Sequence, residues 1–354
     1  IMTIYTRILQ QIGSSILISL PNDWIKKNSL SKGKSITIET NTDNTVSIYN
    51  NYQDEEIKIE FEYGQQDDIN ESNSDIADQV EIKDKLIKIL LNKIFGAYLL
   101  GYNMINIHSK NQISFEDSET IKRATRKLIG LEIVDENSYN IHLQFLIDAR
   151  TLNIEKILSM MNSIITGMFK ETIRSLSEGF GSDLKKKIDS RDDEIDRQYF
   201  LLVRLIRTAI MNKKLASNLN LSNIDMLDYR IAANYLETAG DLIAELISYL
   251  SELKEKKQIA DLIRKIGYSL EEMQHFSIEA FTSTSRDKAF KVNENYEEFK
   301  ESISELKKHI TSNKEIVIND SYSIAMINSI SCLDKIAKCW IDITDLAKPT
   351  YMLK

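Results

Sequence analysis

The chain has 354 residues, enough for two or three domains, and its net charge of −8 excludes a protein covered in phosphate-binding surface. Hydrophobic residues make up 42% and charged residues 28%, which is ordinary for a globular protein. No signal peptide and no run of about 18 apolar residues is visible, so the sequence predicts a cytoplasmic protein without membrane insertion.

The first 50 residues are predicted to form a small, mildly basic β domain, with five basic and three acidic side chains. Trp24 is expected to anchor its core. The predicted elements are extended runs over 4–12 and 16–20, a turn at 13–15, a helical turn over 23–27, and a hairpin with strands at 36–38 and 46–48 around the loop 41–44.

The rest of the chain is predicted to be increasingly helical, since Pro21 and Pro349 are its only prolines. Residues 51–80 are expected to hold an extra strand and an acidic linker, and 81–150 a small α+β domain. Six helices of about 20 to 30 residues follow, three in 151–257 and three in 258–354, which suggests an internal duplication. Cys332 and Cys339 lie about 10 Å apart on one such helix, too far for a disulfide.

The front of the chain resembles the swapped-hairpin DNA-binding domain of the AbrB/MazE class. The resemblance is carried by Arg7-x-Leu9-Gln10-x-x-Gly13-Ser14-Ser15-Ile16-x-Ile18-Ser19-Leu20-Pro21-x-x-Trp24, followed by Leu30-x-Lys32-Gly33-Lys34-x-Ile36-x-Ile38. It implies a β-barrel interleaved from two chains, a homodimer that meets DNA at its loops and strand ends. The family's usual basic residue after the glycine is Ser14 here.

Eight residues of this front are predicted to contact DNA, either from the resemblance or from their charge. The basic ones would contact phosphates with a salt-dependent affinity; ordinary solvated charge is the alternative. The set is Arg7, Gly13, Ser14, Ser15, Lys26, Lys27, Lys32 and Lys34.

The helical part resembles the PhoU family through two motifs. Asp192-Asp193-Glu194-Ile195-Asp196 is similar to the family's D/E-x-x-x-D, and Leu236-Glu237-Thr238-Ala239-Gly240-Asp241 is similar to its L-E-R-I-G-D. Leu333-Asp334-Lys335-Ile336-Ala337-Lys338 looks like a repeat of the second motif. An AbrB/MazE-like front fused to a PhoU-like helical body is similar to archaeal phosphate-uptake regulators. The resemblance implies a multidomain α+β chain that ends in an all-α pair of three-helix bundles.

Four carboxylates of this region are predicted to converge on a metal ion. Asp192 falls inside an apolar helical stripe and Asp196 borders it, while Glu237 and Asp241 share one face of the next helix. Oxygen-only ligands suit iron, manganese, zinc or magnesium. The alternative is that the acids pair with Arg191, Arg197 or Arg230. In the second half Lys338 replaces an acid and is expected to act as an internal cation, which leaves one metal site.

The expected function is that of a non-catalytic regulator of phosphate uptake that binds DNA at its front and senses phosphate status, or a partner, through its body. The alternative is an adaptor that dimerises through its front, binds no DNA and contacts a phosphate transporter or a signalling kinase. A di-metal carboxylate enzyme is disfavoured, because no histidine lies within four residues of the four acids. The four histidines, His108, His142, His275 and His309, show no ligand spacing.

Overall fold

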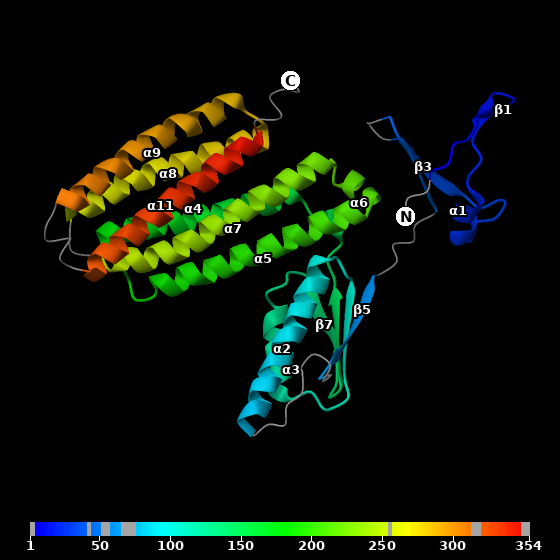
Figure 1. Cartoon of the computed structure of the whole chain (residues 1–354), viewed down its shortest axis with the longest axis horizontal. Coiled ribbons are helices and arrows are strands. Elements are labelled where there is room, and N and C mark those ends of the chain that lie inside the picture. The colour runs from blue at the N-terminus through cyan, green and yellow to red at the C-terminus, as the bar shows by residue number, and fades with distance from the viewer. Residues whose placement is uncertain are drawn as a thin grey trace. The chain divides into compact units, whose positions relative to one another are not determined.

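The structure is a computed structural model in which residues 4–40, 44–50, 57–64, 76–253, 257–312 and 320–347 are described. The chain divides between Glu56 and Ile57 into two compact units (Figure 1). Among the described residues, no helix combines the length and hydropathy that crossing a membrane requires.

The N-terminal unit contains two antiparallel hairpins and one short helix. Strands β1 (Gln10–Ile12) and β2 (Ser15–Leu17) are joined by a tight turn at Gly13, whose φ of +62° favours glycine. Helix α1 (Asn22–Lys27) follows, and β3 (Ile36–Thr40) pairs with β4 (Val46–Asn50). The predicted hairpin is therefore confirmed, with residues 41–43 of its loop outside the described residues. The first extended run becomes a strand only at Gln10.

Within one chain this unit has no core, since none of residues 4–40 and 44–50 is buried. Apolar side chains such as Ile12, Ile16 and Ile38 are more than half exposed. Trp24 is only partly buried, so the predicted small core around it is absent from the single chain. The described strands form two separate two-stranded sheets and no closed barrel, and the AbrB-like fold stays a prediction.

The C-terminal unit begins with a four-stranded sheet. Its elements are β5 (Lys58–Tyr63), α2 (Ile76–Leu99), β6 (Met104–Ser109), α3 (Phe115–Thr125), β7 (Leu131–Glu136) and β8 (Asn140–Phe145). The sheet order is β5-β6-β8-β7, with β5 parallel to β6 and the other pairs antiparallel. The strand expected in 51–80 is thus the edge of this sheet, and α2 begins at Ile76, inside the segment expected to be a linker.

Helices α2 and α3 cover one face of this sheet (Figure 1). Ile105 and Ile107 of β6 and Ile141 and Leu143 of β8 are fully buried on that face. Because side chains alternate along a strand, the residues between them lie on the opposite face of the sheet.

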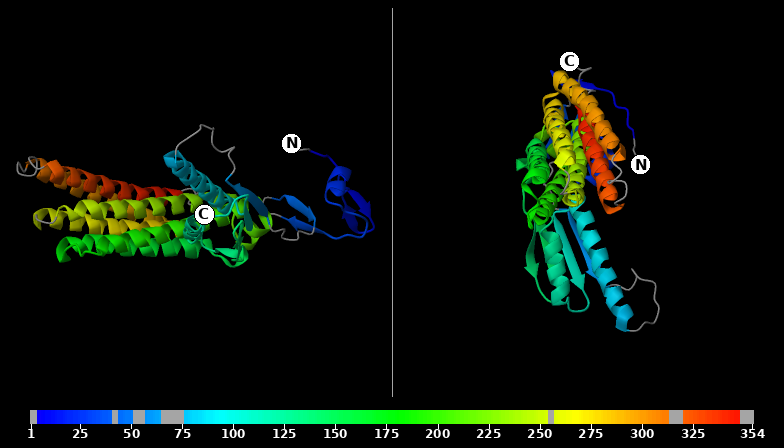
Figure 2. Two further views of the ribbon diagram at one scale, coloured as in Figure 1. Left: turned by 90° about the horizontal axis from the view of Figure 1, so that it is seen from below. Right: turned by 90° about the vertical axis from the view of Figure 1, so that its left-hand side faces the viewer.

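The long helices come in the two expected sets of three. The first set is α4 (Ile154–Glu178), α5 (Leu184–Met211) and α7 (Asn223–Ser251), with the short α6 (Lys213–Asn218) between α5 and α7; the second is α8 (Lys257–Ser283), α9 (Arg286–Ser312) and α11 (Asp320–Ala347). The long helices lie side by side in both views of Figure 2. Contacts of α7 with α11 and of α4 with α8 join the two sets.

A buried arginine joins the sheet region to α5. Arg204 donates to the backbone oxygen of Tyr98 at 2.6 Å and lies 3.9 Å from the ring centroid of Phe145. Burial lowers the pKa of this guanidinium to about 10, and it stays charged at neutral pH. Helix α5, which carries two of the predicted metal ligands, is therefore held at its C-terminal half by a cation in the core.

Candidate functional site

The predicted acidic residues face each other across α5 and α7, which run antiparallel. The two helices approach closely at Gly240, where an added Cβ would lie 2.8 Å from Cδ1 of Ile195 and 3.1 Å from Oδ1 of Asp192. Glycine inside a helix costs about 1 kcal/mol relative to alanine, so its use at Gly240 matches a close approach of two helices. That approach brings the acids of α5 next to those of α7.

Three of the four predicted ligands meet at one point. Asp196, Glu237 and Asp241 each offer a carboxylate oxygen, and the three oxygens lie within 4.8 Å of one another. Asp192 is outside this group of three but lines a surface hollow together with Asp241. The predicted four-way convergence is thus a cluster of three acids with Asp192 beside it.

The electrostatics of the cluster favour a proton or a cation. Burial, followed by the charges of Asp241 and Asp196, raises the pKa of Asp192 to about 7. Burial is also the main cause that raises the pKa values of Asp196, Glu237 and Asp241 above the ordinary carboxyl range. Charging all four carboxylates together is therefore unfavourable unless a positive charge joins them.

The arginines that might have paired with these acids have other partners. Arg191 donates to Glu171 at 3.2 Å, and Arg197 donates to Glu194 at 2.6 Å. Arg230 lies over the ring of Tyr199, 4.9 Å from its centroid. In the part of the chain that the structure describes, none of the four predicted ligands takes part in an ion pair with these arginines.

The acidic surface extends further than the sequence motifs indicated. Asp189 and Glu245 line the same hollow as Asp192 and Asp241. A sequence signal for Glu245 exists, because Glu237, Asp241 and Glu245 follow one another at intervals of four residues and so share a helix face. The remaining lining residues are Lys185, Ala244, Ser248 and Tyr249.

The corresponding place in the second half is neutralised by an ion pair. Lys338 lies 3.3 Å from Asp334, one helical turn earlier on α11. The expectation of an internal cation is wrong in one respect, because the side chain of Lys338 is 58% exposed and its ammonium lies at the surface. Over the described residues, Asp196, Glu237 and Asp241 form the only group of three metal-ligand side chains this close together.

The residues assigned to DNA all lie exposed on the N-terminal unit. The Arg7 guanidinium is 5.4 Å from the ring centroid of Tyr5, and Lys34 donates to the backbone oxygen of Ser29 at 3.3 Å. Gly13 and Ser14 form the β1–β2 turn and Ser15 begins β2, while Lys26 and Lys27 end α1 and Lys32 precedes β3. This exposure is compatible with DNA contact, which stays a prediction.

Comparison with known proteins relates the helices around the acidic cluster to one family. The family profile described as "PhoU domain" matches residues 158–250, from the second turn of α4 to the end of α7. The crystal structure of PhoU from Pseudomonas aeruginosa is similar with a TM-score of 0.49 and 16% identity, over 55% of this chain and 93% of that chain. No curated protein matches the chain. All four predicted metal ligands lie within the stretch that matches the PhoU domain.

Proposed function

We propose that this chain is a non-catalytic regulator of phosphate uptake. In this proposal the N-terminal unit binds DNA as a homodimer, and the helical body senses or relays phosphate status through a metal ion at Asp192, Asp196, Glu237 and Asp241. The observation that carries the proposal is the match of residues 158–250 to the PhoU domain, with three carboxylate oxygens within 4.8 Å inside it.

The donor set fits a hard or borderline cation. It consists of carboxylates alone, which suits iron, manganese, magnesium or zinc. A divalent ion at this place would relieve the repulsion that raises the pKa of Asp192, and Gly240 gives the two helices the close approach that a shared ligand set requires. Asp196, Glu237 and Asp241 would hold the ion, with Asp192 adjacent as a further ligand.

The absence of a buried core in the described part of the N-terminal unit supports a homodimer. Its apolar side chains, including Ile12, Ile16 and Ile38, stay exposed in the single chain. Apolar strands exposed in this way are normally covered, and a second copy would cover them while doubling the set of basic residues around a twofold axis. The exposed residues Arg7 and Lys34 would then contact DNA phosphates.

The metal proposal is tested by elemental analysis of the purified chain. The wild type should carry about one bound transition or alkaline-earth ion, and the Asp192→Ala, Asp241→Ala variant should lose it. Asp334→Ala combined with Glu297→Ala removes two acids from the second half and should keep the metal. Equal metal content in the wild type and the Asp192/Asp241 variant would overturn the site.

The DNA proposal is tested by gel shifts with DNA from upstream of phosphate-transport genes. The wild type should bind at low salt and release at high salt, and Arg7→Ala with Lys34→Ala should abolish binding. Lys85→Ala with Arg123→Ala, at two exposed positions of the sheet region, is the matched control. Absence of binding at low salt by an intact dimer would favour the adaptor, which Ser14 in place of a basic residue already supports.

A further inference from the structure

The open face of the four-stranded sheet brings together two of the four histidines. Asn106 and His108 on β6, and Asn140 and His142 on β8, alternate with buried apolar residues and so lie on the face that α2 and α3 leave uncovered. The two histidines are far apart in the sequence and half-buried, and the fold brings their rings together. A sequence signal existed, because each strand contains the tripeptide Asn-Ile-His.

The antiparallel pairing of β6 and β8 turns this repeat into a local twofold arrangement. Asn106 lies opposite His142, and His108 lies opposite Asn140. The two imidazole rings are in edge contact, with centroids 5.9 Å apart. Two strands that are far apart in sequence therefore present their histidines to the same point on the sheet.

Hydrogen bonds fix which ring nitrogen is available. Nδ1 of His108 is 2.6 Å from Oδ1 of Asn140, and Nδ1 of His142 is 2.9 Å from Oδ1 of Asn106. An amide oxygen can only accept, so each Nδ1 carries the hydrogen and each Nε2 keeps its lone pair. The amide of Asn140 is held in this orientation because its Nδ2 donates to Oδ1 of Asn137 at 3.2 Å.

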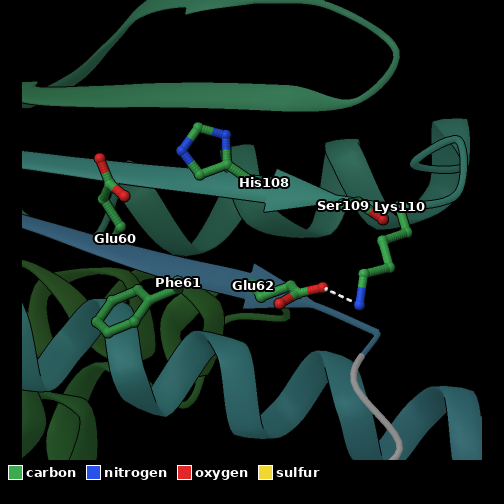
Figure 3. A pocket seen from close by; sticks show the side chains of 6 residues that line it. All are labelled: Glu60, Phe61, Glu62, His108, Ser109 and Lys110. Atoms are coloured by element: carbon green, nitrogen blue, oxygen red, sulfur yellow. Dashed lines mark ion pairs between the residues drawn. The ribbon is translucent and has the colours of Figure 1, made fainter.

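Carboxylates surround the pair. Oδ2 of Asp135 is 3.9 Å from Nε2 of His142. Glu60 and Glu62 of β5 line a surface hollow with His108, and Figure 3 shows the Glu60 carboxylate on the same side of the sheet as the His108 ring. Glu62 forms an ion pair with Lys110 at 2.9 Å. This acidic surrounding repels nucleic-acid phosphates and attracts cations.

We propose that Nε2 of His108 and Nε2 of His142 bind one divalent transition metal ion, of which Zn²⁺ and Ni²⁺ are examples, and that the exposed Asp135 side chain, 3.9 Å from His142, moves in to add a carboxylate ligand. Imidazole nitrogen selects such ions over Mg²⁺ and Ca²⁺. An ion about 2.1 Å from each Nε2 places the ring centroids about 5 to 6 Å apart, close to the spacing in the sheet. A histidine ligand usually donates its other ring N–H to an oxygen acceptor, and both asparagines supply one here.

This site is separate from the acidic cluster in sequence, in donor chemistry and in place. The test therefore uses full-length Asp192→Ala, Asp241→Ala protein, freed of metal, so that the acidic cluster contributes nothing. Zn²⁺ alone is titrated by calorimetry. We expect one site, which His108→Ala and His142→Ala each weaken at least tenfold, whereas Mn²⁺ and Mg²⁺ bind far more weakly.

The remaining variants separate ligation from folding. His275→Ala is the matched control, since His275 also lies near a carboxylate, 3.5 Å from Glu279, and should leave the Zn²⁺ affinity unchanged. Asn140→Ala removes the oxygen that accepts from Nδ1 of His108 and should weaken Zn²⁺ binding about tenfold. Asn140→Asp, which keeps an acceptor oxygen there, should restore the affinity. His108→Gln and His142→Gln keep a donor for the asparagines and preserve the sheet. Unchanged Zn²⁺ affinity in the glutamine variants would overturn the proposal, as would equal loss in His275→Ala.

Discussion

The two three-helix halves of the helical body carry similar motifs, at 236–241 and 333–338, but the acidic side chains of these motifs have different surroundings. In the first half, Glu237 and Asp241 on α7 face α5 and form no ion pair among the described residues, and the pKa values of both carboxyls are raised, mainly by burial. In the second half, Asp334 and Lys338 take the same two positions on α11 and form an ion pair at 3.3 Å. One half thus neutralises itself, whereas the other keeps a negative charge that an external cation can satisfy.

The residue that precedes the second of these positions also differs between the halves. Gly240 stands one residue before Asp241, and Ala337 stands one residue before Lys338. Ala337 is fully buried with its methyl group in place, while a methyl group at Gly240 would meet Ile195 at 2.8 Å. In the half that matches the PhoU domain, a position without room for a methyl group therefore stands beside acids that form no ion pair among the described residues.

The largest expected effect comes from placing a lysine at position 241, as the second half has at Lys338. Asp241→Lys removes a ligand and places an ammonium beside Asp196 and Glu237, so Mn²⁺ affinity should fall more than about a hundredfold. Asp241→Asn, which removes the charge without adding a cation, should cause a smaller loss. Equilibrium dialysis measures both. If Asp241→Lys retains wild-type affinity, the acidic cluster is not the metal site.

A smaller effect is expected from giving position 240 the methyl group that Ala337 has in the second half. Gly240→Ala gains helix propensity of about 1 kcal/mol but overpacks Ile195 at a cost of about 1 to 3 kcal/mol, for a net loss of about 1 kcal/mol. Urea unfolding without metal measures the loss, and Mn²⁺ affinity should fall with it because Asp192 is pushed away. The mirror variant Ala337→Gly should destabilise by about 1 kcal/mol and leave Mn²⁺ affinity unchanged. A stabilised Gly240→Ala protein with intact affinity would contradict the close-approach argument.

Sequence reasoning succeeded where local patterns decide the structure and fell short where pairing across the chain decides it. Helical periodicity located the long helices, and the spacing of four residues placed Glu237 and Asp241 on one face. The partner of Arg191 could not be read from the sequence, because Glu171 lies on α4, whereas the partner of Arg197 is Glu194 at the local i, i+3 spacing on the same helix. The pairing of β6 with β8, which joins His108 to His142, likewise depends on strand register.

A third effect concerns the change of folding stability with pH, which should have the opposite sign to that of an ordinary salt-bridged carboxyl. Because the folded pKa of Asp192 is raised to about 7, its proton stabilises the fold at low pH, and this contribution is lost as pH rises from about 4 to 7. The metal-free protein should therefore be less stable at pH 8 than at pH 5. Asp192→Asn should reduce that decline by about 1 kcal/mol, since the half-exposed group is partly screened.

Urea midpoints across pH 5 to 8 measure this decline, and Mn²⁺ sharpens the comparison. A bound cation replaces the proton, so saturating Mn²⁺ should stabilise the wild type more at pH 8 than at pH 5. The Asp192→Asn variant should gain less from Mn²⁺ at pH 8. An identical pH slope in the wild type and Asp192→Asn would show that the acids of the first half are already neutralised within the chain.

The smallest expected effect is the reverse exchange, Lys338→Asp, which gives the second half two acids one turn apart. The ion pair of Lys338 is at the surface, so its loss should change the urea midpoint less than Asp192→Asn does. No Mn²⁺ site should appear, because the α9 group that acts on Lys338 is the phenol of Tyr296, whereas in the first half α5 supplies the carboxylate of Asp196 next to Glu237 and Asp241. Mn²⁺ binding by Lys338→Asp in the Asp192→Ala, Asp241→Ala background would instead reduce the difference between the halves to one residue.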